Sequence, residues 1–185
     1  MQRKSGKLNR LKSIKHKKEK NLMSYEIHPK ARIGHIHLTV GNLERAVKFY
    51  TEMLGFSVTA RFGDSAMFLS SGNYHHHIGL NTWAGENAVA PPSGHTGLYH
   101  FAILYPSREE LAKAFKVLWE NKYPIDGASD HGVSESIYLK DPDGNGIELY
   151  CDRPQEEWPV DEEGNVVMIT KALDLPSLLS ELNNE

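Results

Sequence analysis

The sequence predicts an α+β fold in which two βαβββ modules pair their sheets around a central cavity, with the helices outside. Three observations predict it: a pattern that occurs twice between residues 31 and 151, strand-like alternation at the start of each copy, and helical spacing directly after it. The modules are residues 31–83 and 96–151, and a loop rich in Gly and Pro joins them. Because a single module leaves one face of its sheet open, we expect the two modules to close on each other.

The first module begins with a strand. Apolar and polar side chains alternate over residues 33–40, which places His35 and His37 on the polar face. Asn42 is then typical of a helix N-cap, and Gly55 of a helix end. Three short strands are expected after the helix, near residues 56–62, 65–71 and 76–82.

The second module repeats this order. Its first strand, near residues 98–104, carries His100 at the position that His35 has in the first copy. Ser107 is a suitable cap for a helix that runs to about Asn121. The remaining strands are expected near residues 125–129, 134–140 and 146–151. The two histidines then lie at equivalent places, both on the cavity face.

Both ends of the chain differ from this repeat. Residues 1–25 are predicted to be a disordered basic extension, since the first 20 residues carry a net charge of +8 and lack the apolar stretch of a secretory signal. The tail, residues 152–185, ends in a short amphipathic helix, whose apolar face is compatible with a homodimer.

Composition excludes several classes of protein. The residues after position 20 carry a net charge of −11, which argues against a nucleic-acid partner. No apolar run is long enough to span a membrane. Cys151 is the single cysteine, so neither an intramolecular disulfide nor a cysteine-built zinc site is expected, and a cytoplasmic location is favoured.

The last strand of the second module supplies a candidate metal ligand. If Ile147 and Leu149 face the helix, Glu148 points into the cavity, and a buried carboxylate without a partner is unfavourable. A divalent cation held by His35, His100 and Glu148 would supply the missing charge. Two imidazoles and one carboxylate form the facial triad that suits non-haem Fe(II), although Mn(II), Zn(II) and Ni(II) accept the same ligands.

Three stretches form a recognisable set of motifs: the alternating run at 33–40, Phe49-Tyr50-Thr51-Glu52-Met53-Leu54-Gly55-Phe56, and Asp141-Pro142-Asp143-Gly144-Asn145 with the following Ile147-Glu148-Leu149. They resemble the vicinal oxygen chelate superfamily, which includes glyoxalase I, the fosfomycin and bleomycin resistance proteins and the extradiol ring-cleaving dioxygenases. The resemblance covers about residues 31–151.

The order of His131-Gly132-Val133-Ser134, Tyr138 and Glu148 looks like the end of an extradiol active site. The resemblance implies that O2 is the co-substrate, that the substrate is a small catechol-type aromatic, and that His131 and Tyr138 hydrogen-bond the substrate or the oxygen. It also implies that His76, as the imidazolium, donates a proton. Strict alternation would instead turn His75 and His77 inward, so a bulge is needed for His76. The candidates for the substrate-binding wall are His37, Phe68, Trp83 and Tyr150.

Two other functions stay open. One is a glyoxalase-type isomerase or thiol transferase on the same scaffold. Gly79 stands where the second module has Glu148, so it offers no acidic fourth ligand of the kind such isomerases usually carry. The other is a metal-free protein that binds a small molecule. The tail also resembles the segment that joins the two halves of longer dioxygenases.

Overall fold

The computed structural model describes residues 25–183. The chain divides into two compact units between Arg32 and Ile33, and the helices and strands of the described residues lie in the second unit. The predicted extension 1–25 lies, apart from Tyr25, outside the described residues.

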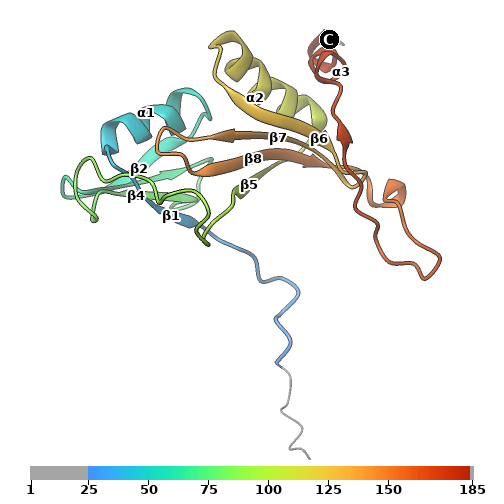
Figure 1. Ribbon diagram of the computed structural model, residues 1–185, viewed down its shortest axis with the longest axis horizontal. Coiled ribbons are helices and arrows are strands. Elements are labelled where there is room, and N and C mark those ends of the chain that lie inside the picture. The colour runs from blue at the N-terminus through green and yellow to red at the C-terminus, as the bar shows by residue number, and fades with distance from the viewer. Residues whose placement is uncertain (1–24, 184–185) are drawn as a thin grey trace, which may run out of the picture. The chain divides into compact units, whose positions relative to one another are not determined.

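The first module has the predicted element order (Figure 1). Its four strands form one sheet in the order β1-β4-β3-β2, with β1 parallel to β4 and the other pairs antiparallel. The Asn42 side chain caps the helix by accepting a hydrogen bond from Arg45 N, as its position predicts. The elements are β1 (Ile36–Thr39), α1 (Leu43–Glu52), β2 (Ser57–Phe62), β3 (Ala66–Ser70) and β4 (Ile78–Asn81).

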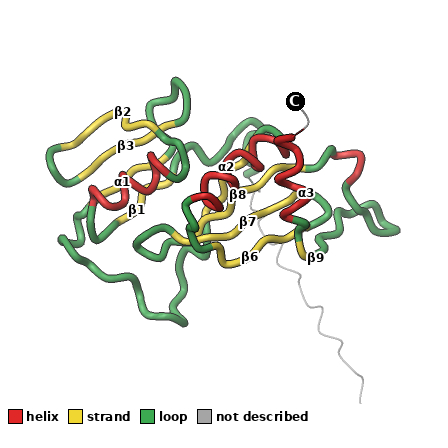
Figure 2. The backbone as a smooth tube through the Cα atoms, turned by 90° about the horizontal axis from the view of Figure 1, so that it is seen from above, coloured by secondary structure: helices red, strands yellow, loops and turns green. Residues whose placement is uncertain are grey.

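The second module repeats this arrangement and adds a strand from the tail. Its sheet has the order β5-β8-β7-β6-β9, and β9 was not predicted (Figure 2). Ser107 caps α2, as expected. The elements are β5 (Phe101–Tyr105), α2 (Arg108–Glu120), β6 (Ile125–Asp130), β7 (Ser134–Lys140) and β8 (Gly146–Asp152), followed by β9 (Lys171–Ala172) and α3 (Leu175–Ser180), with short 3-10 turns at Gln155–Glu157 and Glu181–Asn183.

The strand register confirms the repeat residue by residue. In the first module His37 lies beside Gly79, and in the second Ala102 lies beside Glu148. Gly79 and Glu148 therefore occupy equivalent positions. A Cβ atom on Gly79 would lie 2.9 Å from the ring of His37, so the imidazole fills the space that a longer side chain would need.

A single apolar core joins the modules, but their sheets do not close into a barrel. Buried residues of both copies, including Leu38, Leu80, Leu139 and Leu149, belong to one cluster. Within residues 25–183, however, no strand ladder links the two sheets. The predicted α+β fold of two βαβββ modules is thus confirmed, with two separate sheets that are not closed into a barrel. The polar contacts between the modules join α1 and the residue Gly41 before it to the turn between β7 and β8, and do not come from the sheet edges.

The described residues, 25–183, contain no helix that is long and apolar enough to cross a membrane.

Candidate metal and substrate site

His100 and Glu148 form a close pair on adjacent strands. His100 directly precedes β5, which runs parallel to β8, and its Nε2 atom lies 3.1 Å from Glu148 Oε2. Along β8, Ile147 and Leu149 are fully buried while Glu148 turns to the other face, as the alternation predicts. The Glu148 side chain is 13% exposed. The Nδ1 atom of His100 is buried and has no hydrogen-bond partner among the described residues.

Tyr138 and His131 extend this pair into a chain of polar contacts. The Tyr138 hydroxyl lies 3.0 Å from Glu148 Oε1 and 2.7 Å from His131 Nε2, and it can donate its one proton to either of them. Tyr138 stands beside Glu148 in the antiparallel β7–β8 ladder, which aims both side chains at the same face. Burial and the neighbouring carboxylate raise the pKa of Tyr138, so its hydroxyl stays protonated and able to donate at neutral pH.

His35 and His76 meet in the first module. Their ring centroids lie 4.5 Å apart, and the His76 ring is 5.0 Å from that of Phe68. Strand β4 begins only at Ile78, so strict alternation does not govern the residues before it. His77 turns away, because its Nδ1 atom lies 2.9 Å from the Ser70 hydroxyl. Of His76 and His77, it is therefore His76 whose ring lies beside that of His35, while its catalytic role stays a prediction.

The neighbouring imidazoles affect the protonation of His76. Burial and the nearby rings of His35, His75, His37 and His77 lower the pKa of His76, because each of them disfavours a positive charge on its ring. The neutral ring is therefore favoured in the chain alone, and the role of His76 as a proton donor stays a prediction.

The candidates for the substrate-binding wall divide between the modules. The ring of His37 lies 5.8 Å from Phe68 and 5.2 Å from Trp83, centroid to centroid. Trp83 is 62% exposed. Tyr150 is two residues beyond Glu148 on β8 and shares its half-buried face. Three of the four candidates thus lie together with His76, and the fourth lies with Glu148.

The three predicted metal ligands are not assembled as one group. Among residues 25–183, no cluster of three or more His, Cys, Asp or Glu side chains is placed to hold a metal ion. His100 and Glu148 fit two positions of such a site, since an imidazole nitrogen and a carboxylate oxygen face each other across 3.1 Å. His35 lies with His76 instead, so the full ligand set stays a prediction. Two cavities of about 360 and 330 Å³ involve none of the predicted site residues.

One contact of the site was missed by the sequence prediction. The Nδ1 atom of His131 lies 2.9 Å from the backbone carbonyl oxygen of Ile169, in the tail. Nothing in the residue types signals this contact, because a backbone carbonyl is present at every position.

With two βαβββ modules and an imidazole–carboxylate pair on the second, the chain has the features of a known class. Residues 32–149 match the model of the Glyoxalase/Bleomycin resistance protein/Dioxygenase superfamily, and the chain belongs to this family.

The similar proteins include dioxygenases. The chain is 44% identical over 160 residues to a catechol-2,3-dioxygenase of Bacillus subtilis, covering 86% of this chain and 55% of the relative. It is 30% identical over 122 residues to biphenyl-2,3-diol 1,2-dioxygenase 3 of Rhodococcus globerulus, covering 65% of this chain and 63% of the relative. The chain therefore spans between about half and two thirds of these relatives. A glyoxalase/dioxygenase from Nostoc punctiforme has a similar fold, with a TM-score of 0.57 and 22% identity over 71% of this chain and 99% of that one.

Proposed function

We propose that the chain is a metal-dependent extradiol dioxygenase domain that cleaves the ring of a catechol-type aromatic with O2. The observation that carries the proposal is the unbroken series of polar contacts from His100 through Glu148 and Tyr138 to His131. The 44% identity to a catechol-2,3-dioxygenase supports it. In this reaction both atoms of O2 enter the product, and the ring bond beside one hydroxyl-bearing carbon breaks to give an open-chain semialdehyde acid.

In this proposal His100 and Glu148 hold a divalent metal, and His35 supplies the third ligand. When bound, an ion such as Fe(II) or Mn(II) would supply Lewis acidity. It would also supply a route for one-electron transfer between the aromatic ring and O2, which do not react directly. His35 must approach the His100–Glu148 pair for the ligand set to be complete. Iron is our first choice, because two histidines and one carboxylate leave open positions for the substrate and O2.

The surrounding side chains orient the substrate and handle its protons. The Tyr138 hydroxyl, poised between His131 and Glu148, can hydrogen-bond a substrate oxygen that lies next to Glu148. His131 can exchange a proton through that hydroxyl. The aromatic surface of Phe68 and His37 would accept the face of a planar ring.

Oxygen uptake tests the proposal. The full chain, loaded anaerobically with Fe(II), is mixed with catechol and with 2,3-dihydroxybiphenyl while O2 and the absorbance of the ring-opened product are followed. We expect one O2 consumed for each product molecule, and strong loss of turnover in the His100→Ala variant. Turnover of methylglyoxal with glutathione, without oxygen consumption, would instead favour a glyoxalase-type isomerase.

A second candidate function follows from the separation of the predicted ligands. Since no three-ligand group forms among residues 25–183, a protein that binds a small aromatic without a metal is also consistent with the geometry. In that case catechol affinity, measured by calorimetry in the presence of a chelator, would be the same for the wild type and for His100→Ala. A metal-dependent site predicts that the chelator abolishes most of the binding.

A further inference from the structure

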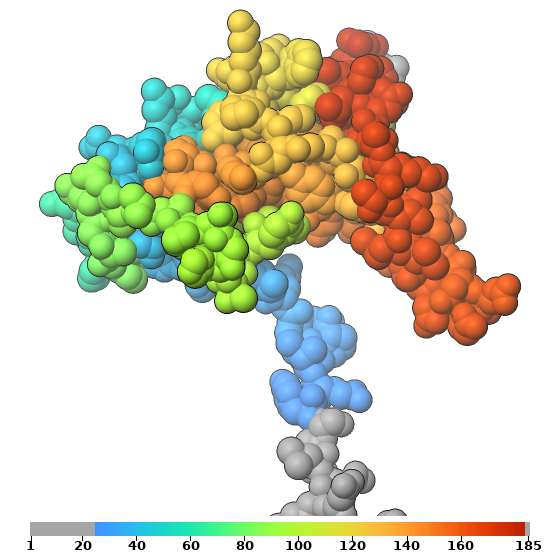
Figure 3. All heavy atoms as spheres, in the orientation of Figure 1, coloured from blue at the N-terminus to red at the C-terminus, as the bar shows by residue number. Residues whose placement is uncertain are grey.

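The tail of the chain lies against the edge of the second sheet where His131 is found. In Figure 3 the tail, coloured orange to red, lies beside the second module. Strand β9 pairs with β6, which ends at Asp130, directly before His131. The backbone N–H of Ile169 donates to the carbonyl oxygen of His131 at 3.2 Å. These contacts come from residues beyond the family match, which ends at residue 149.

We propose that residues 159–172, here called the tail strap, are a positioning element that fixes His131 as its Nδ1–H tautomer and aims its Nε2 atom at Tyr138. This inference rests on the proposed function for the role of His131 in turnover. The placement of the proton on the ring can be tested without it.

The contacts of the ring determine which nitrogen carries the proton. The carbonyl oxygen of Ile169, 2.9 Å from Nδ1, can only accept a hydrogen bond, so Nδ1 must donate. In the neutral imidazole Nε2 then has a free lone pair, which faces the Tyr138 hydroxyl at 2.7 Å. A ring with the proton on Nε2 would set the Nδ1 lone pair against the carbonyl oxygen.

The Tyr138 hydroxyl has one proton and two neighbours that accept it. It donates either to His131 Nε2 or to Glu148 Oε1, at 2.7 and 3.0 Å. If His131 takes up a second proton, its Nε2–H donates to the Tyr138 oxygen, which frees the phenol proton for Glu148. Because the strap keeps a proton on Nδ1, Nε2 is the nitrogen of His131 that can exchange a proton with the Tyr138 hydroxyl.

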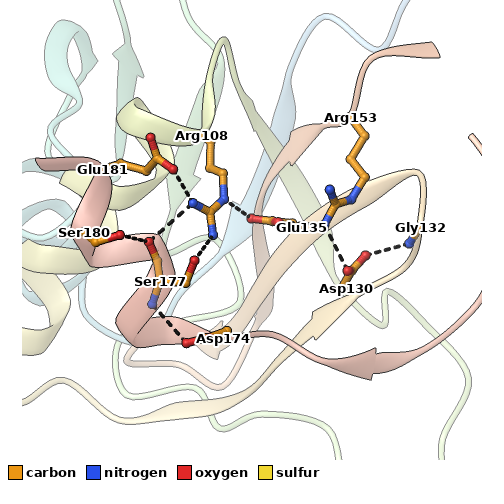
Figure 4. A network of polar contacts seen from close by, with 9 residues as sticks. All are labelled: Arg108, Asp130, Gly132, Glu135, Arg153, Asp174, Ser177, Ser180 and Glu181. Atoms are coloured by element: carbon orange, nitrogen blue, oxygen red, sulfur yellow. Dashed lines mark hydrogen bonds and ion pairs between the residues drawn. The ribbon is translucent and has the colours of Figure 1, made fainter. Parts of the chain in front are cut away.

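Charged residues also hold the backbone next to His131 (Figure 4). Gly132 N donates to Asp130 Oδ1 at 2.8 Å, and Arg153 binds Asp130 Oδ2 at 2.9 Å. Arg153 also binds the buried Glu135, which in turn accepts from Arg108.

The same network reaches the end of the chain. Arg108 binds the Ser177 carbonyl and the Glu181 carboxylate, on α3 and in the 3-10 turn after it. The tail thus contacts the ring of His131 directly, and its last helix is tied through Arg108 to the residues that hold the neighbouring backbone.

Gly132 lies in close contact with the strap. A Cβ atom added there would lie 2.9 Å from Pro159 Cγ and 3.0 Å from Ile169 Cγ1, so the Gly132→Ala variant must push against the Pro159 ring and the Ile169 side chain of the strap. Gly132 also has a φ of +76°, which an alanine disfavours by itself. Gly164 is a matched control, because it lies in the strap, has a φ of +84° and has no atom within 4 Å of its added Cβ.

Thr170 offers a competing partner that must be excluded. Its hydroxyl lies 3.4 Å from His131 Nδ1, where it can donate to an unprotonated nitrogen. The carbonyl oxygen is 0.5 Å nearer than the hydroxyl, at 2.9 Å, so we assign the contact to the carbonyl. The Thr170→Val variant separates the two, since it removes the hydroxyl and leaves the carbonyl.

The experiment is nitrogen-15 NMR of the histidine rings in the full-length, metal-free protein. In neutral rings at about pH 9, well above the ordinary histidine range, we expect the wild type, Thr170→Val and Gly164→Ala to show a protonated Nδ1 and an unprotonated Nε2. We expect Gly132→Ala to show a mixture of both tautomers. In the metal-loaded enzyme, kcat of Gly132→Ala should fall on the order of tenfold or more with KM little changed.

Three results would overturn the proposal: an Nε2–H tautomer in the wild type, an Nε2–H tautomer in Thr170→Val, or a Gly132→Ala variant with the tautomer and kcat of the wild type. The first needs no variant, so the proposal remains testable if Gly132→Ala does not fold. If the wild type shows the Nδ1–H tautomer but no ring cleavage, the proposed function fails while the assigned positioning of His131 stands.

Discussion

Replacing Tyr50 with Phe should weaken the contact between the two modules. Tyr50 on α1 is fully buried, and its hydroxyl donates to Asp141 Oδ2 at 2.9 Å in the turn before β8. Asp141 is itself 4% exposed, and its Oδ1 atom accepts from the backbone N–H groups of Asp143 and Asn145. Burial and the Asp141 carboxylate raise the pKa of Tyr50, so the hydroxyl remains a donor throughout the accessible pH range.

The size of the effect follows from the loss of one hydrogen bond without a change of packing. A hydrogen bond to a charged group contributes about 1.5–3 kcal/mol net. The phenylalanine ring keeps the contact with Phe49, whose centroid lies 5.0 Å away, and Asp141 Oδ2 keeps the Asn145 side-chain amide as a donor. We therefore expect the Tyr50→Phe variant to lose about 2 kcal/mol of unfolding free energy, which for a chain of this size lowers Tm by roughly 4–8 °C.

Urea denaturation followed by circular dichroism measures this change. The Tyr123→Phe variant is the control, because its hydroxyl donates at 2.8 Å to a neutral acceptor, the carbonyl of Lys140. That variant should lose about 1 kcal/mol or less. In a double-mutant cycle with Asp141→Asn, the effect of Tyr50→Phe should fall by more than half. A Tyr50→Phe variant no less stable than Tyr123→Phe would refute the reasoning.

Three further changes test other parts of the molecule. Burial raises the pKa of Asp130, but the Gly132 N–H and Arg153 outweigh it and hold that pKa below its usual value. The stabilisation by Asp130 is therefore present at neutral pH and lost as the pH falls below about 4. In thermal unfolding, Asp130→Asn should cost roughly 1 kcal/mol of unfolding free energy at pH 7 and much less near pH 3. An equal cost at both pH values would contradict this. Leu178 on α3 is fully buried, and Leu178→Ala should destabilise the chain by about 2–5 kcal/mol in urea, whereas a loss under 1 kcal/mol would mean that α3 is not part of the core. Glu148→Gln should reduce Fe(II) affinity at least about tenfold in anaerobic titration, and unchanged affinity would exclude Glu148 as a ligand.

The fold could be predicted because the relevant signals are local and occur twice. In β8 the alternation of Ile147, Glu148 and Leu149 fixes which side chains face the core, and the structure agrees. The caps Asn42 and Ser107 mark the helix starts correctly, since each satisfies backbone N–H groups of its own first turn.

The boundaries were predicted less well than the elements. The first strand was expected over residues 33–40 but spans Ile36–Thr39, and the one that holds Gly79 begins at Ile78 instead of residue 76. A periodic pattern continues past the last ladder hydrogen bond, so it overstates strand length. This error also created the difficulty over His76, which precedes β4 and is free to turn toward His35.

The site could be predicted only within each module. Parity along a strand tells that His100 and Glu148 share a face, and the parallel pairing of β5 with β8 then brings them to 3.1 Å. The distance from His35 to that pair depends on how the two sheets meet. Their contacts run through Tyr50, Arg45 and the turn after β7, which the repeat pattern does not encode.

The contact between the tail and His131 could not be predicted from the sequence. The sequence indicated that residues 152–185 were helical and apolar at the end, but the contact with His131 is made by the backbone of Ile169, 38 residues away. A backbone carbonyl carries no sequence signature, so only the strand pairing of β9 with β6 reveals it. Because this pairing anchors the segment that carries Ile169, two residues before β9, the strap that leads into the added strand also determines where the His131 proton resides.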